Sequence, residues 1–262
     1  MGKIINLARS VVQITGPDAQ KLLHDTLTCN LSKPLEDAAH WFALLAPQGK
    51  ILFEGLISAD GQDGFLIDIR STDKDDFIKR MRLYKMRANL EIIPRDELGV
   101  GWSLDAQSGA KQDVRPGMGF RQYAADTEGW NADLDAFHAA RVKACIMELG
   151  VDFEGSNLFP HDIGMDQLQG VDFQKGCYVG QEVVSRMQHR GTARKRPVCV
   201  IGDAAVDNEI ICNDKSVGSV TSAKGQQAIA LVRLDKVSDP NACFIGDAPI
   251  QLAVPEWASY AF

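Results

Sequence analysis

The pattern of the chain changes near Arg196, and this change limits the folds that are open to it. Beyond that point, the runs "RPVCVIG", "NEIICN", "KSVGSVTSA", "QQAIALVRL" and "APIQLAV" are short and apolar, and Gly, Asp and Asn turns separate them. Short apolar runs with frequent turn signals are typical of all-β structure. We therefore expect a small all-β barrel or sandwich over residues 193–262, with a boundary near Thr192 to Pro197.

The first 192 residues mix strand and helix patterns. Strands are expected over residues 11–15, 41–47, 51–58, 64–70 and 90–94, and helices from Pro17 and over 73–86 and 134–149. The three strands between residues 41 and 70 are joined by turns, which favours an antiparallel meander. The pattern predicts an α+β region, residues 1–192, followed by the all-β region.

Composition excludes several classes of function. The net charge of −7 argues against a protein that mainly binds nucleic acid. Six Cys without CxxC spacing predict neither a disulfide scaffold nor a metal cage. The sequence shows no apolar signal core and no run of about 18 apolar residues. We therefore expect that the protein does not contact a membrane and that it is located in the reducing cytoplasm.

The most specific short motif is "KGCYVGQE", residues 175–182. Gly176 and Gly180 allow a positive φ or the close approach of a ligand, and "GQEVVSRM" predicts the start of a helix. A thiol at Cys177, beside a helix N-terminus and the cation of Lys175, should favour the thiolate. The alternative is a buried structural Cys in a glycine-shaped turn.

The residues around this motif also allow two readings. Gln181 and Glu182 can orient a ligand amide or a pterin edge, or they can cap the helix. The basic cluster of Arg186, His189, Arg190, Arg194, Lys195 and Arg196 suits either a solvated linker or an anionic tail such as polyglutamate. His161 and Asp162 lack a companion ligand at fixed spacing, which favours a loop pair over a metal site.

Four segments in order carry a resemblance to a known family. They are "GPDAQKLLHDTLTCN", "LLAPQGKILFE", "FPHDIGMDQLQGVDF" and "KGCYVGQE", and the terminal β region follows them. Together they resemble the YgfZ family of folate-binding proteins, relatives of the aminomethyltransferase (T-protein, GcvT) of the glycine cleavage system. The resemblance implies ferredoxin-like, GcvT-type α/β domains around a central folate channel, plus a C-terminal barrel.

The resemblance also implies the site and its partners. The ligand is tetrahydrofolate, with or without a polyglutamate tail, and the protein partners are iron–sulfur clients or assembly proteins. Cys177 is the implied catalytic residue, and no metal ligand is implied. The implied folate contacts are Glu54, Lys175, Gly176, Tyr178, Gly180, Gln181, Glu182 and Arg186.

Two departures from the aminomethyltransferases bear on the activity. Those enzymes carry an Asp-Asp pair in the hairpin where this chain has Phe53 and Glu54, and their Arg-Leu-Glu-Ala-Gly segment reads "RVKAC" here, with Lys143 in place of Glu. Both departures argue against glycine cleavage.

The residues and the resemblance together leave three candidate functions. The first is a tetrahydrofolate-binding protein that assists iron–sulfur cluster assembly or repair. The second is a folate-dependent one-carbon transferase or demethylase with Glu54 as general base, and the third is a module that contacts an iron–sulfur partner through Cys177 without turning over folate. The sequence leaves open whether Cys177 meets a metal, a cluster or another thiol. Cys199 and Cys212 are expected as inert thiols buried in apolar strands.

Overall fold

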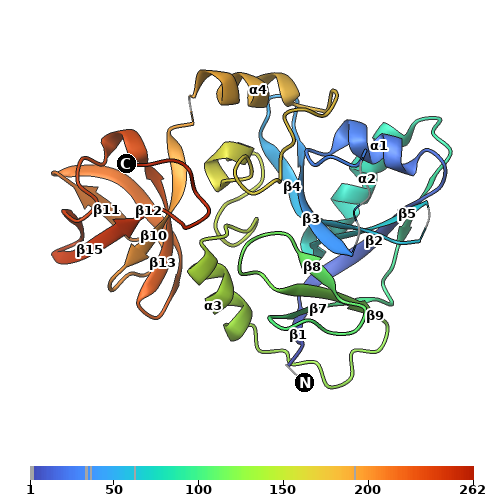
Figure 1. Cartoon of the computed structure of the whole chain (residues 1–262), viewed down its shortest axis with the longest axis horizontal. Coiled ribbons are helices and arrows are strands. Elements are labelled where there is room, and N and C mark those ends of the chain that lie inside the picture. The colour runs from blue at the N-terminus through green and yellow to red at the C-terminus, as the bar shows by residue number, and fades with distance from the viewer. Residues whose placement is uncertain (1–2, 33–34, 36, 62, 192) are drawn as a thin grey trace.

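The molecule has a larger α/β part and a smaller barrel that lies beside it (Figure 1). The computed structural model describes residues 3–32, 35, 37–61, 63–191 and 193–262. Thr192, at the expected boundary, lies outside these residues, and the first barrel strand begins at Lys195. The division of the chain into two domains at residue 192 therefore stays a prediction.

The α/β part is built on a nine-stranded sheet in the order β1-β7-β9-β8-β3-β4-β5-β2-β6. The strands in this order are Ile5–Leu7, Gly99–Ser103, Phe120–Ala124, Lys111–Asp113, Ala38–Leu45, Ile51–Ala59, Gly64–Arg70, Arg9–Thr15 and Glu91–Pro94. Only the β3–β8 pair is parallel among these neighbours. The predicted meander is confirmed as β3-β4-β5.

Side chains alternate between the two faces of this sheet, because successive strand residues point in opposite directions. On β3, Phe42 and Leu44 face helices α1 (Ala19–Thr26) and α2 (Lys74–Lys85) and form one apolar core with them. Trp41 and Ala43 face the other way, into a core shared with residues of the segment 137–184 and of the barrel. The second core joins the two parts of the molecule.

Helix α3 (Asp135–Ala144) is shorter than the sequence predicted. It ends at Cys145, which has the left-handed conformation (φ 55°, ψ 45°) and donates its N–H back to the carbonyl of Val142. Such a residue stops a helix, and glycine usually occupies it. The prediction of a helix to residue 149 was wrong because apolar spacing alone did not reveal this conformation.

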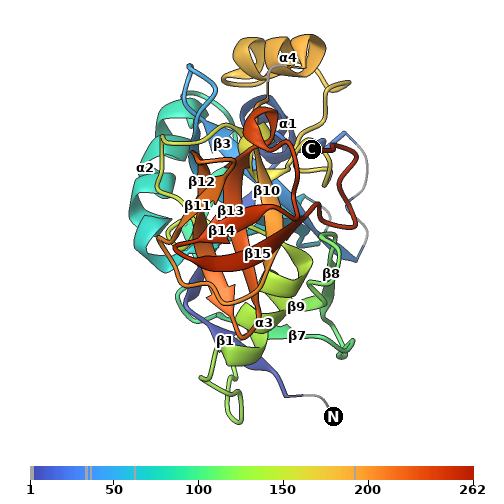
Figure 2. The same cartoon turned by 90° about the vertical axis from the view of Figure 1, so that its left-hand side faces the viewer.

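The barrel is closed, in the order β10-β13-β12-β11-β14-β15, which confirms the expected fold (Figure 2). In chain order its strands are β10 Lys195–Ile201, β11 Glu209–Cys212, β12 Lys215–Lys224, β13 Gln227–Arg233, β14 Cys243–Ile245 and β15 Ala248–Ala253. Cys212 and Cys243 stand opposite each other on β11 and β14, with Cα atoms 4.4 Å apart, and form a disulfide. The expectation that Cys212 is an inert thiol was therefore wrong, because the strand pairing that joins it to Cys243 is not visible in either run.

Helix α4 (Gln181–Arg190) lies along the upper edge of the molecule and precedes the barrel (Figure 1). Among its residues only Val184 is buried. Three short 3-10 turns complete the fold: η1 Ser71–Asp73, η2 Pro160–Ile163 and η3 Leu234–Lys236. Among the residues that the structure describes, no helix combines the length and the apolar character needed to cross a membrane.

Candidate functional site

The loop that carries the sequence motif packs against the turn between β3 and β4. Gly180 has φ 79° and forms the N-cap of α4, as the motif predicted. A Cβ atom on Gly180 would lie 2.6 Å from the carbonyl oxygen of Ala46 and 3.1 Å from the Cα of Gly49. Because Gly180 has no side chain, the loop can lie close to the turn between β3 and β4.

Lys175 anchors the other end of the loop. Its buried ammonium donates hydrogen bonds to the carbonyl oxygens of Leu27 (2.6 Å), Cys29 (2.8 Å) and His24, at and just beyond the C-terminal end of α1. Burial lowers the pKa of Lys175 to about 8, despite the nearby carboxylate of Asp172. The ammonium is therefore directed to backbone carbonyls, and the predicted role of Lys175 as the cation that stabilises a Cys177 thiolate gains no support.

Cys177 itself is exposed, which contradicts the alternative of a buried structural Cys. Its neighbour Gly176 has no left-handed φ, and a Cβ atom on it would meet no other atom within 4 Å. Gly176 therefore does not adopt the predicted positive φ, and the alternative reason, close approach of a ligand, stays a prediction. The thiol of Cys177 is therefore exposed, and the space beside Gly176 is open. The contacts of Lys175 and Gly180 hold the two ends of this loop in place.

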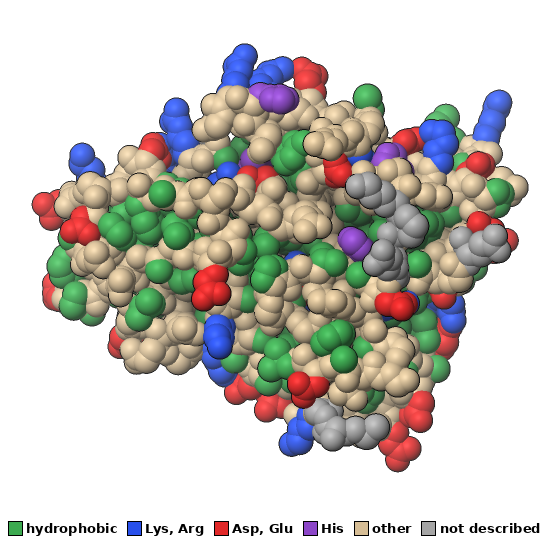
Figure 3. All heavy atoms as spheres, in the orientation of Figure 1, with side chains coloured by type: hydrophobic (Ala, Val, Ile, Leu, Met, Phe, Trp, Pro, Cys, Tyr) green, Lys and Arg blue, Asp and Glu red, His purple; other side chains and the backbone are tan. Residues whose placement is uncertain are grey.

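The polar residues that follow are on the outer surface. Glu182 and Arg186 are 84% and 55% exposed in their side chains, and they pair with each other at 2.6 Å across one turn of α4. Figure 3 shows Lys, Arg and His side chains along the upper edge, where this helix lies. Gln181 begins the helix and donates its backbone N–H to Tyr178, whose ring is buried 5.1 Å from the ammonium of Lys175.

Glu54 is buried on β4, remote in sequence from the motif. Its carboxylate accepts hydrogen bonds from the indole N–H of Trp41 (2.5 Å) and from the backbone N–H of Leu149 (3.3 Å). Each carboxylate oxygen therefore has a donor. The adjacent Phe53 points to the opposite face, where its ring contacts Phe77 edge-on at 5.7 Å.

A buried charge cluster surrounds Glu54, and the sequence analysis did not predict it. We use this name for Arg9, Glu54, Asp68, Asp113, Arg115, Arg121, Arg141, Glu148 and Asp152. Arg121 lies 3.6 Å from Asp68 and 3.4 Å from Asp113, and all three side chains are almost fully buried. Two signals were available in the sequence: Asp68 within the apolar strand "GFLIDIR" and Glu54 within "ILFEGLIS".

Several polar atoms in this region lack a hydrogen-bond partner among the described residues. They include Nε and Nη1 of Arg121, the hydroxyl of Tyr123 and Oγ of Ser58. Buried polar groups are normally satisfied by protein, water or ligand. Nε of Arg121 nevertheless lies 3.6 Å from a carboxylate oxygen of Asp68, and the hydroxyl of Tyr123 lies near that of Ser58.

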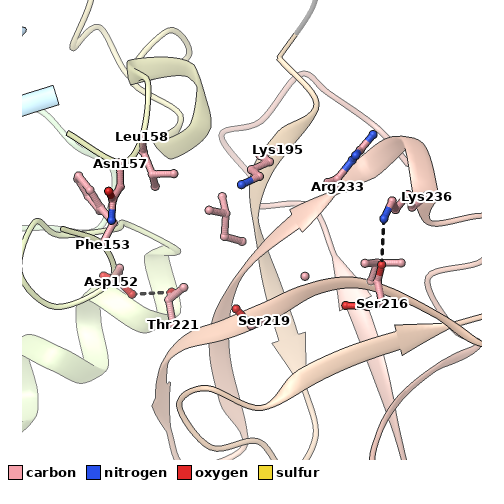
Figure 4. Close-up of a pocket in the computed structure, with 13 residues that line it drawn as sticks. Asp152, Phe153, Asn157, Leu158, Lys195, Ser216, Ser219, Thr221, Arg233 and Lys236 are labelled. Atoms are coloured by element: carbon pink, nitrogen blue, oxygen red, sulfur yellow. Dashed lines mark hydrogen bonds between the residues drawn. The ribbon is translucent and has the colours of Figure 1, made fainter. Parts of the chain in front are cut away.

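A cleft of about 400 Å³ separates the α/β part from the barrel (Figure 4). Asp152 and Asn157 lie on one wall, and Lys195, Arg233 and Lys236 come from the barrel side. The remaining lining residues are Phe153, Leu158, Ser216, Val217, Gly218, Ser219, Thr221 and Leu231. Asp152 also belongs to the buried charge cluster, so the cleft adjoins that cluster.

The cleft is lined by none of the nine site residues predicted from the sequence. Of the basic cluster, Lys195 alone is in the lining. Arg196 is buried instead and pairs with Asp166 at 2.6 Å, while it donates to the carbonyl of His161. Within the described ranges, no group of three or more His, Cys, Asp or Glu residues could hold a metal ion.

Comparison with known proteins gives one family model and three similar proteins. Residues 194–260 match the family model of the CAF17 C-terminal beta-barrel domain. The chain is 28% identical to the iron-sulfur cluster assembly factor IBA57 homolog, mitochondrial, of Pyricularia oryzae, over 88% of this chain and 72% of that protein. It is 26% identical to human IBA57, mitochondrial, over 95% and 83%. The IBA57 homolog of Neurospora crassa is 28% identical over 72% of this chain, which spans about half (51%) of that relative.

A solved structure has the same fold. The glycine cleavage system aminomethyltransferase T from Bartonella henselae superposes with a TM-score of 0.76 at 12% identity, over 96% of this chain and 84% of that one. The predicted GcvT-type fold with a C-terminal barrel is confirmed. The expected cytoplasmic location is contradicted, because the IBA57 relatives are named as mitochondrial proteins. A missing signal pattern was not sufficient ground for that expectation.

Proposed function

We propose that this protein binds a reduced folate, tetrahydrofolate, and assists the assembly or repair of iron–sulfur clusters. The observation that carries the iron–sulfur part is the exposed thiol of Cys177 on a loop with two fixed ends, in a chain whose relatives are named iron–sulfur cluster assembly factors. A thiolate is a natural ligand for iron and a nucleophile toward other sulfur. A fixed and exposed loop suits contact with a partner protein.

The cleft between the α/β part and the barrel is our candidate for the folate. Its volume of about 400 Å³ is within the range of sites for drug-sized ligands. Phe153 and Leu158 offer apolar surface to a ring, and Lys195 and Lys236 offer charge to the carboxylates of a glutamate tail.

Aminomethyl transfer as in glycine cleavage is not part of this proposal. Lys143, which replaces the acidic residue of the aminomethyltransferases, is exposed on α3, and Phe53 packs into the core on the helical face. Glu54 faces the interior, but both of its oxygens accept hydrogen bonds. This arrangement suits a group that positions its neighbours better than it suits the general base of a one-carbon transferase.

Titration calorimetry with tetrahydrofolate tests the folate part. Wild type and Cys177→Ala should bind with micromolar affinity or better, which corresponds to about 8 kcal/mol. Lys195→Glu should weaken binding at least tenfold, whereas Lys215→Glu, an exposed charge change on β12 outside the cleft, should not. The absence of saturable binding to any reduced folate, with or without a polyglutamate tail, would exclude this part.

Complementation tests the iron–sulfur part separately. A strain that lacks the gene should regain the activity of its iron–sulfur enzymes with wild type but not with Cys177→Ala at equal protein level. Cys29→Ala, which removes a buried thiol, is the matched control and should restore activity. Full rescue by Cys177→Ala would show that the loop acts without its thiol.

A further inference from the structure

Two thiols that the proposed function does not use meet where α3 contacts the barrel. Cys145 ends α3 and is fully buried. On β10, Val198 and Val200 point into the barrel core, so Cys199 between them points outward and packs against the core that contains Cys145. The two residues thus bring together the α/β part and the barrel.

The two thiols lie close enough for each to shift the pKa of the other. Burial raises the pKa of Cys145, whereas the neighbouring Cys145 lowers the pKa of Cys199. The thiolate is therefore favoured at Cys199 relative to Cys145. Cys199 is also partly exposed, so a small oxidant can reach its sulfur.

The surrounding contacts keep the two thiols together. The indole N–H of Trp257 donates to the carbonyl of Ala144, next to Cys145, at 2.8 Å. The hydroxyl of Tyr260 donates to the carbonyl of Pro197, two residues before Cys199, at 2.7 Å. The same C-terminal segment therefore holds the end of α3 and β10 in place on both sides of the pair.

We propose that Cys145 and Cys199 are a redox site that a hydroperoxide converts to a disulfide between the α/β part and the barrel. The Cys199 thiolate attacks the peroxide O–O bond, which yields a sulfenic acid and releases hydroxide. The Cys145 sulfur then attacks the sulfenic sulfur and loses its proton, and the hydroxyl leaves as water. Overall, two thiols and one hydrogen peroxide give one disulfide and two waters.

Peptide mapping after peroxide treatment tests this proposal. The protein should carry Cys177→Ala, so that the exposed thiol does not compete. After one equivalent of hydrogen peroxide and alkylation under denaturing conditions, we expect a cross-linked peptide pair containing Cys145 and Cys199, with Cys29 still alkylated. Dithiothreitol should restore both thiols.

Two variants identify the roles within the pair. Cys145→Gly suits the left-handed backbone at this position and should fold normally. With peroxide it should accumulate a sulfenic acid at Cys199, detectable with dimedone, and no cross-link. Cys199→Ser should form neither product at these positions. The proposal is overturned if Cys145 and Cys199 both stay alkylatable in folded wild type, or if Cys199 forms its disulfide with another Cys.

Discussion

Two glycines flank Cys177 on opposite sides, but the backbone needs only one of them. Gly180 combines φ 79° with atoms that leave no space for a side chain, while Gly176 has neither restriction. We expect Gly180→Ala to lower the free energy of unfolding by about 1–3 kcal/mol because of backbone strain. Gly176→Ala is the matched control and should stay within about 0.5 kcal/mol. Denaturant unfolding of both variants measures the difference, and equal losses would contradict this assignment.

Lys175 makes the stability of the loop depend on pH. Replacing it by Met leaves three buried carbonyls without their donor, which should cost about 1–3 kcal/mol at neutral pH. Its folded pKa of about 8 lies below its ordinary value of 10.5, so between these values the unfolded chain binds more protons. The contribution of Lys175 to stability therefore rises with pH from about 8 toward 10.5.

Unfolding of wild type and Lys175→Met at several pH values between 7 and about 10 measures this effect. The difference in unfolding free energy should widen as pH rises. Burial raises the pKa of the neighbouring Cys29 and Tyr178, so both stay protonated through most of this range. Lys50→Met, at a partly exposed Lys that donates to a single carbonyl, should show no such widening. A difference that narrows would mean that the ammonium is not desolvated.

At the scale of elements, β5 depends on a charge in its centre. Asp68 is fully buried and pairs with Arg9 and Arg121. Asp68→Asn leaves two buried guanidinium groups without this carboxylate, and we expect a loss of about 3–5 kcal/mol. Asp73→Asn removes a partly exposed pair with Arg70 and should cost less than about 1 kcal/mol. Chemical denaturation distinguishes the two, and a small loss for Asp68→Asn would show that water already compensates these charges.

The elements also show which features can be predicted from sequence. The strands β3, β4 and β5 were predictable because their apolar runs and the turns between them are local. The residues that pair with Asp68 and Cys212 could not be predicted, because they come from strands that are distant in the sequence and adjacent only in the folded sheet. The motif predicted the N-cap at Gly180 correctly, yet it could not show that Lys175 binds carbonyls of α1.

At the scale of the whole molecule, Asp152 couples the α/β part to the barrel. Its buried carboxylate pairs with Arg141 and accepts hydrogen bonds from Thr221 (2.7 Å) and Ser222 (2.6 Å) of β12. We expect Asp152→Ala to cost about 3–5 kcal/mol and to split the thermal unfolding into two transitions. Asp247→Ala, in an exposed turn of the barrel, is the control and should leave one transition. A single unshifted transition for Asp152→Ala in calorimetry would contradict the coupling role.

The C-terminal segment limits how this protein can be recombined with its relatives. Trp257 packs within contact distance of Gly164 and bonds to α3, while Ser259 bonds to Gln167, so the residues after β15 return to the α/β part. A chimera that exchanged only the closed strands would mismatch this segment with a foreign surface. The exchangeable unit is therefore the barrel together with its tail and with the surface around Gly164 that receives it.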